Sequence, residues 1–307
     1  MTHYFDTVRA IVLDKGTKKS KIERLQKEVG CTVYEANVYY NNLFSEFSLK
    51  RSEIEQKEGK LRFTIGVEIE CFGINKDRVM DSLGRRGVSA INTGYSHEDS
   101  DTFYKLGYDG SISGENACEV VSPILKSLKS LKEVCDVINE AGAQVNRSCG
   151  LHVHFGADKF TPAQWQRIIV NYAAIEPVID SFMPMSRRGN NNHYCRSIVE
   201  VSHRVDAFAN VTMSKIQDDF CYGRYFKVNV MAYDRHKTIE FRQHSGTTEF
   251  DKIKNWIDFL SAFLAWTLKH EERLAASCVD DLPFLNSRQK KFYNDRVNHF
   301  RTIEENA

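Results

Sequence analysis

Residues 63–73, FTIGVEIECFG, decide the fold that the sequence predicts. Val67 and Ile69 alternate here with Glu68 and Glu70. Successive side chains of a β-strand point to opposite faces, so the stretch predicts a strand with one apolar and one acidic face. Two adjacent carboxylates repel each other and are costly to desolvate, and a divalent cation is the simplest compensation. A solvated acidic face is the alternative interpretation.

Two later stretches repeat this design. Residues 149–156, CGLHVHFG, place His152 and His154 on one face, and residues 238–244, TIEFRQH, place Glu240, Arg242 and His244 on one face. Each pattern alone is also typical of ordinary strands, with hydrogen-bonded histidines in the first and a cross-strand ion pair in the second. Their conjunction, with Glu119 at the start of a short strand over residues 118–123, indicates a polar surface suited to metal ions and an anionic substrate.

The apolar faces of these strands require helices packed against them. Amphipathic helical patterns occur at residues 127–141, 251–268 and 287–305, and a capping box of Thr161 and Gln164 opens a further long helix. The sequence therefore predicts the α+β class, with a curved, mostly antiparallel sheet that has a polar active-site face and helices on its other face. Residues 75–107 predict a long irregular connection that contains one short strand at 88–91.

The loop at residues 187–196, RRGNNNHYCR, is dense in cationic donors. Such donors suit an anionic ligand, since guanidinium groups make bidentate contacts with phosphate and carboxylate groups. A solvated surface loop is the alternative.

The N-terminal residues 1–50 predict a small unit of three helices that resembles a helix-turn-helix. Capping boxes start its second helix at Ser20 and its third at Thr32, and Gly30 ends the second. The charged stretch 51–60 predicts a linker. After the linker we expect a catalytic core over residues 61–270 and a C-terminal helical extension of that core over residues 271–307. The third helix lacks Arg and Lys, which favours a docking or oligomerisation role over DNA binding.

Composition narrows the class of protein. The 307 residues hold 42 Lys and Arg against 41 Asp and Glu, so a broad surface for nucleic acid is not indicated. No apolar run reaches the length of a membrane span, and the N-terminus lacks the apolar core of a signal peptide. The eight cysteines include no CxxC pair, which is typical of reduced thiols in a cytoplasmic protein.

Six blocks occur together in one order: GVEIE (66–70), DGS (109–111), EVVSP (119–123), CGLHVHFG (149–156), the arginine-rich loop, and TIEFR (238–242) followed by Gly246-Thr247. This set resembles the putative amidoligase family, which is grouped with the glutamine synthetase and glutamate–cysteine ligase fold of carboxylate–amine ligases. The resemblance covers about residues 61–260. It implies a glutamine synthetase-like catalytic fold for the core.

The resemblance also implies roles for individual residues. The metal ligands it implies, for two or more Mg²⁺ ions or for Mn²⁺, are Glu68, Glu70, Glu119, His152 and Glu240. The implied catalytic residues are Glu119, His152, His154 and Arg242. The implied ATP-binding residues are Arg187, Arg188, Arg196 and Arg242.

The reaction implied by the resemblance is ATP-dependent amide or peptide bond formation through an acyl phosphate, between small-molecule or peptide carboxylates and amines. The related synthetases often build their sites across subunits, so the resemblance also allows for a homo-oligomer. A metal-dependent hydrolase or nuclease using the same carboxylates and histidines is the first alternative. A non-catalytic binding protein that works through the N-terminal helices is the second.

Overall fold

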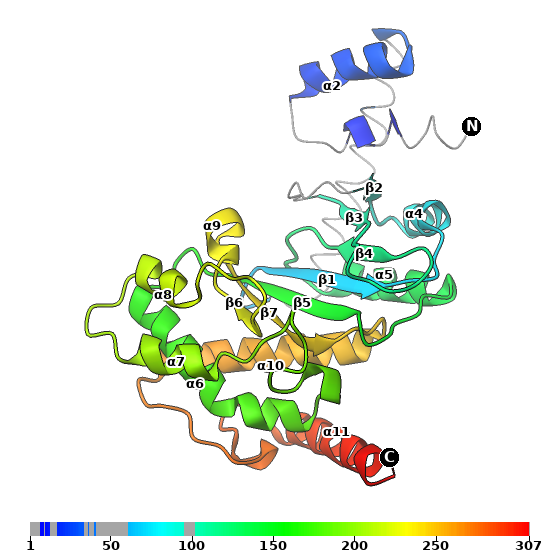
Figure 1. The fold of residues 1–307 in the computed structure, drawn as a ribbon. Coiled ribbons are helices and arrows are strands. Elements are labelled where there is room, and N and C mark those ends of the chain that lie inside the picture. The colour runs from blue at the N-terminus through cyan, green and yellow to red at the C-terminus, as the bar shows by residue number, and fades with distance from the viewer. Residues whose placement is uncertain are drawn as a thin grey trace. The chain divides into compact units, whose positions relative to one another are not determined.

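The computed structural model of the chain describes residues 7–8, 10–12, 17–33, 36, 40, 61–94 and 102–306 (Figure 1). The chain divides into two compact units. The first comprises Met1–Asn146 with Thr248–Phe250, and the second comprises Arg147–Thr247 with Asp251–Ala307. The predicted linker at 51–60 lies outside the described residues. No helix in the described part of the chain is long and apolar enough to cross a membrane.

The cap of helix α2 lies three residues earlier than predicted, at Thr17 instead of Ser20. Helix α2 spans Lys18–Arg24 and continues as a π-helix over Leu25–Val29. The side chain of Thr17 accepts a hydrogen bond from the backbone N–H of Ser20, so Thr17 is the cap and Ser20 lies inside the helix. Gly30 ends the segment with a left-handed φ of 73°, as predicted. The predicted third helix lies mostly outside the described residues.

The first unit holds four strands in the order β2-β3-β4-β1. β1 (Ile65–Cys71) pairs antiparallel with β4 (Cys118–Val121), and β4 pairs antiparallel with β3 (Tyr104–Gly107). β2 (Ala90–Gly94) pairs parallel with β3. Helix α5 (Lys129–Glu140) lies within the predicted range and buries the apolar stripe that its sequence contains. Strand β1 lies within residues 63–73, where the sequence predicted it, and is therefore confirmed.

The prediction of a single short strand in residues 75–107 was wrong in two respects, because this stretch contains helix α4 over Lys76–Arg85 and a second strand, β3. The side chain of Asn75 caps the helix by accepting a hydrogen bond from the backbone N–H of Arg78 at 3.0 Å. Val79, Met80 and Leu83 form its buried face. Ten residues give only one short apolar stripe, which the surrounding Gly, Asp and Asn residues obscured in the sequence.

The second unit holds β5 (Gly150–Gly156), β7 (Thr238–Ser245) and β6 (Val228–Asn229), antiparallel in the order β5-β7-β6. Helices α6 (Pro162–Ser181) and α10 (Phe250–Lys269) cover one face of these strands (Figure 1). Phe241 of β7 contacts Tyr172 of α6 and Phe263 of α10, with ring centroids 5.4 and 6.3 Å apart. Seven mostly antiparallel strands with packed helices confirm the predicted α+β class.

Further helices lie in the second unit. They are a 3₁₀ turn at Met185–Arg187, α7 (Val199–Asp206), α8 (Met213–Asp219), α9 (Ala232–His236), a 3₁₀ turn at Val279–Asp281 and α11 (Ser287–Glu305). Tyr293 attaches α11 to the others, because its ring lies 4.5 Å from that of Phe182 and its hydroxyl donates to the carbonyl oxygen of Asn255. The helix predicted at 287–305 is confirmed.

A β-bulge interrupts the alternation of β7. Leu151 of β5 lies opposite His244, whereas Val153 lies opposite Phe241, so β7 contributes one more residue than β5 between these pairs. A bulge of this kind places two successive side chains on one face. Gln243 donates to Asp180 of α6, and the His244 ring lies 5.5 Å from that of Trp256 of α10. Both side chains therefore lie on the helix side.

A fully buried lysine joins α6 to the strands. The ammonium group of Lys227 lies 2.9 Å from Oε1 of Glu176 and 2.6 Å from Oδ1 of Asp180. The second carboxylate oxygen of Asp180 accepts from the backbone N–H of Gly189, and that of Glu176 accepts from the backbone N–H of Ile198. This buried network therefore fixes both ends of the arginine-rich loop.

Candidate active site

Three carboxylates of the first unit converge on one face of its strands. Glu70 of β1 lies directly opposite Glu119 of β4, and directly opposed residues of adjacent strands share a face. Asp109 lies in the turn before β4, where its Oδ1 accepts a hydrogen bond from the backbone N–H of Ser111. Glu70, Asp109 and Glu119 each place a carboxylate oxygen within 4.8 Å of the other two. Glu70 is 4% exposed, so this charge is taken almost entirely out of water.

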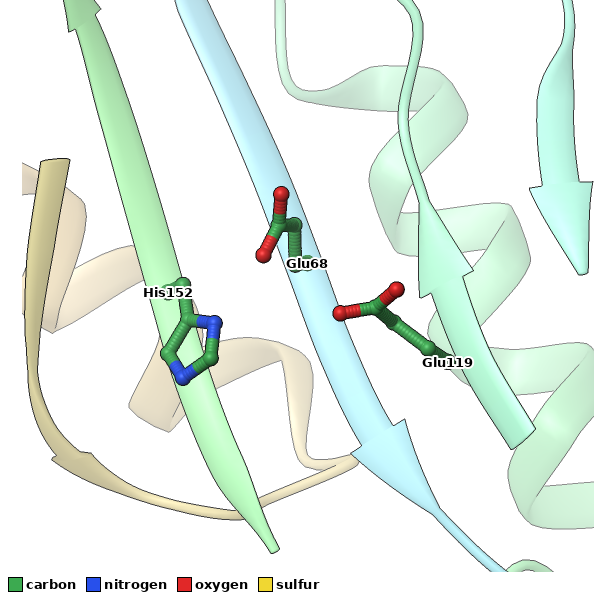
Figure 2. Close-up of side chains that lie close together, drawn as sticks. All are labelled: Glu68, Glu119 and His152. Atoms are coloured by element: carbon green, nitrogen blue, oxygen red, sulfur yellow. The ribbon is translucent and has the colours of Figure 1, made fainter. Parts of the chain in front are cut away.

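Glu68 shares this face, because it lies two residues before Glu70 on β1. Figure 2 shows Glu68 on β1 and Glu119 on the neighbouring strand β4. Lys105 of β3 also belongs to this face, since it lies opposite Val121, which itself lies opposite Glu68. The described residues of these four strands and of the Asp109 turn thus contribute four carboxylates to this face. They also contribute one buried ammonium group, that of Lys105.

The chemistry of this donor set fits a divalent cation. Like charges directly opposed on adjacent strands are destabilising, and burial raises the cost of keeping them ionised. A hard cation such as Mg²⁺ selects carboxylate oxygens, and it would offset both the repulsion between the carboxylates and the cost of burying them ionised. The predicted residues Glu68, Glu70 and Glu119 all belong to the set.

Glu240 is the centre of a second polar cluster, in the second unit. Its Oε1 accepts a hydrogen bond from Nη1 of Arg242 at 2.5 Å, and its Oε2 accepts from Nδ2 of Asn229 at 2.5 Å. Nδ1 of His152 lies 3.6 Å from the same Oε1, and Nε2 of His154 lies 3.9 Å from it. Four of the five polar side chains predicted on this face of β5 and β7 are therefore brought together, and His244 is the exception.

The two histidines differ in their second contacts. Nδ1 of His152 lies 3.5 Å from Nη1 of Arg242, whereas Nδ1 of His154 lies 3.0 Å from the hydroxyl oxygen of Thr238. Both rings are buried, and the face they share is the one opposite the helices. His152 is thus the histidine next to the guanidinium group, and His154 is the one next to Thr238.

Arg187 is the loop arginine that lies beside this cluster. It is 3% exposed, and its Nη2 donates to the carbonyl oxygen of Cys149. A β-carbon at Gly150 would lie 2.8 Å from Nε2 of His152 and 3.4 Å from both terminal nitrogens of Arg187, so these two side chains approach the same point. The buried Nε of Arg187 makes no hydrogen bond within the described part of the chain. An anionic oxygen is the acceptor that such a donor favours.

The other two loop arginines are held elsewhere. Arg188 forms an ion pair with Glu304 of α11 at 2.6 Å, and its Nε donates to the carbonyl oxygen of Met183. The guanidinium carbon of Arg196 lies 4.2 Å from the centre of the Phe226 ring. Arg188 thus fastens the loop to α11, and Arg196 stacks on an aromatic ring.

Sequence reasoning missed Asp109, Lys105 and Asn229. Asp109 was visible as the first residue of the DGS turn, but a turn aspartate has a common local role, which it also fulfils here through Ser111. Asn229 and Lys227 would share a face in an unbroken strand, yet Lys227 contacts α6 while Asn229 contacts Glu240. The regular pairing of β6 begins only at Val228, so the alternation around Lys227 could not be extrapolated.

His244 does not share a face with Glu240 and Arg242, contrary to the alternating pattern. The bulge moves it to the helix side, where its Nδ1 donates to the carbonyl oxygen of Ser245 at 2.7 Å. Burial, and then the positive charge of Arg296, lower the pKa of His244 to about 3. It is therefore a neutral core residue at physiological pH.

Comparison with known proteins identifies the family. A search among curated proteins finds no match. A family model described as "Putative amidoligase enzyme" matches residues 61–264, a span that includes both polar clusters. The match covers well over half of the 307 residues. The chain therefore belongs to the putative amidoligase enzyme family.

Proposed function

We propose that the protein is an ATP-dependent carbon–nitrogen ligase, and that the two clusters serve one reaction. The proposal is supported above all by the complementary chemistry of the clusters, which the family match spans together. One offers hard carboxylate oxygens, as a magnesium ion requires, and the other offers buried guanidinium groups, as a phosphoryl group requires. A glutamine synthetase-like arrangement of the core belongs to the same proposal.

The ligands proposed for Mg²⁺ are Glu68, Glu70 and Glu119 in the first unit, with His152 and Glu240 contributing from the second. Asp109 joins this set because its carboxylate lies with those of Glu70 and Glu119. Bound Mg²⁺ would neutralise negative charge on the phosphate oxygens of ATP.

Arg242 and Arg187 are proposed to hold the transferring phosphoryl group. Arg242 is already oriented by Glu240, and Arg187 is buried with one N–H donor directed to no protein acceptor among the described residues. Preoriented donors stabilise developing charge without reorganisation. The imidazoles of His152 and His154 would donate further hydrogen bonds to the same oxygens, whereas Arg188 and Arg196 would position the loop.

In the proposed reaction an oxygen of the substrate carboxylate attacks the γ-phosphorus of ATP, and ADP departs. The nitrogen of the amine then attacks the carbonyl carbon of the acyl phosphate, and inorganic phosphate departs. The proton lost by the amine passes to a carboxylate, for which Glu119 is the candidate. Activation is needed because a carboxylate is a poor electrophile, and the protein contributes mainly position and charge.

The test is ADP release in the presence of Mg²⁺ and a panel of amino acids, peptides and amines. We expect ADP formation that depends on both a carboxylate and an amine, and we expect Glu68→Gln to abolish it while leaving the fold intact. Glu115→Gln is the matched control, because Glu115 is an exposed residue of the same unit. ADP formation that persists in Glu68→Gln would overturn the metal assignment. Water-dependent cleavage without an amine would instead indicate a hydrolase.

A further inference from the structure

A cluster of aromatic side chains lies on the protein surface next to Arg242. The ring centroids of Tyr194 and Tyr225 are 5.1 Å apart, and the His193 ring lies 5.5 Å from the first and 5.6 Å from the second. Tyr194 is 46% exposed, and His193 is exposed as well. Aromatic rings gathered at a surface in this way are typical of a binding site.

The cluster is rigidly built. The backbone N–H of Arg196 donates to the carbonyl oxygen of Tyr225 at 2.9 Å, and that of Lys227 donates to the carbonyl oxygen of Arg196 at 2.8 Å. The backbone N–H of Tyr194 donates to Oδ1 of Asn192. The two chain segments that carry the rings are thereby paired, and Lys227 of the second segment is held by the buried network.

The aromatic cluster is hydrogen-bonded directly to Arg242, which is proposed to bind the phosphoryl group. Nε of Arg242 donates to the carbonyl oxygen of Tyr194 at 3.4 Å, while Nη1 of the same guanidinium donates to Glu240. The thiol of Cys195 donates to the carbonyl oxygen of Arg242. A ligand whose phosphates contact Arg242 would thus have aromatic rings within reach of its other end.

A cation adds to this surface. The guanidinium carbon of Arg224 lies 5.0 Å from the centre of the Tyr225 ring, and its Nη2 donates to the Tyr225 hydroxyl at 3.1 Å. Aromatic faces with an adjacent arginine bind flat, electron-rich heterocycles, since every nucleobase has a π-face on which to stack.

We propose that His193, Tyr194, Tyr225 and Arg224 form the binding site for the purine base of the nucleoside triphosphate. This inference rests on the proposed function, because that function supplies the triphosphate at Arg242. The base stacks on the exposed Tyr194 ring, and the cluster contributes affinity for the nucleoside part of the ligand but none for its phosphates.

The test compares two ligands in two variants. Binding of ATP and of inorganic tripolyphosphate, each with Mg²⁺, is measured by calorimetry for the full chain, for Tyr194→Ala and for Tyr194→Phe. We expect Tyr194→Ala to bind ATP about tenfold more weakly and tripolyphosphate unchanged, because loss of one stacking ring removes only the base contact. Tyr194→Phe keeps the ring and should bind both ligands like the wild type.

Tyr222→Ala is the control, since Tyr222 is 59% exposed and its hydroxyl donates to Asp218, outside the cluster. An equal loss for both ligands in Tyr194→Ala would show that Tyr194 acts through Arg242, and would overturn the inference. Unchanged ATP binding in Tyr194→Ala would overturn it too. Those results leave the proposed ligase intact, whereas a wild-type protein that binds neither ligand would refute both.

Discussion

Lys227→Met removes the positive charge from the most deeply buried ion network among the described residues. The Lys227 side chain is fully buried, that of Glu176 is 3% exposed and that of Asp180 is 19% exposed. Methionine has a similar length and leaves little cavity. The variant therefore tests the charge rather than the packing.

The expected loss of folding stability follows from the two ion pairs that Lys227 makes with Glu176 and Asp180. Breaking a buried ion pair typically costs about 3–5 kcal/mol, because the partner is left as an uncompensated buried charge. Here two carboxylates lose one cation, although Asp180 keeps some access to water and hydrogen bonds from Gln243 and Gly189. We therefore expect destabilisation of about 4 kcal/mol, or a melting temperature lower by roughly 10 °C for a unit of this size.

The assay is thermal and urea unfolding of the full chain, followed by circular dichroism. Lys254→Met is the matched control, because Lys254 forms a surface pair with Asp258 at 2.5 Å in which both side chains are more than a third exposed. An exposed pair of this kind contributes less than about 1 kcal/mol. Equal effects of the two substitutions would refute the assignment of a stabilising role to the buried network.

Two further predictions concern charge and pH. Glu119→Gln should raise stability without metal by about 0.5 kcal/mol, since it removes an opposed like charge, yet it should abolish the stabilisation expected from the proposed Mg²⁺ site of the wild type; thermal scans with and without Mg²⁺ check both signs. Below about pH 6.5 the unfolded chain protonates His244, while the folded protein does not until about pH 3, so stability falls as the pH falls. Between pH 7 and pH 5 the wild type should lose about 2 kcal/mol more than His244→Leu, as measured by urea unfolding at each pH; parallel losses would contradict the buried, neutral state of His244.

Strand alternation predicted the strands of the site because it is a local property. In β1 and β5 the apolar and polar residues alternate without interruption, so both the elements and the faces of Glu68 and His152 could be read from the sequence. The same rule failed for His244, because the bulge in β7 adds one residue to the strand. Nothing in TIEFRQH marks that bulge. It depends on contacts of Gln243 and His244 with helices that are distant in sequence.

The buried network explains why the positions of the loop arginines could not be predicted. Glu176 and Asp180 lie on α6 about fifty residues before Lys227, and each acid alone resembles an ordinary polar residue of a surface helix. Only the tertiary fold shows that they neutralise Lys227 and accept the backbone N–H groups of Ile198 and Gly189.

Strand β7 therefore lies between two charged clusters, one that fixes the arginine-rich loop and one that orients Arg242. On the helix side, Gln243 donates to Asp180 within the network that fixes the loop. On the opposite side, Glu240 orients Arg242, whose Nε donates to the carbonyl oxygen of loop residue Tyr194. Because the loop is held from both sides of one strand, a change in the buried network should displace Arg187 and Tyr194 together. Loss of the proposed nucleotide binding in Lys227→Met below its melting temperature would be the signature of that coupling, and Lys254→Met should then match the wild type.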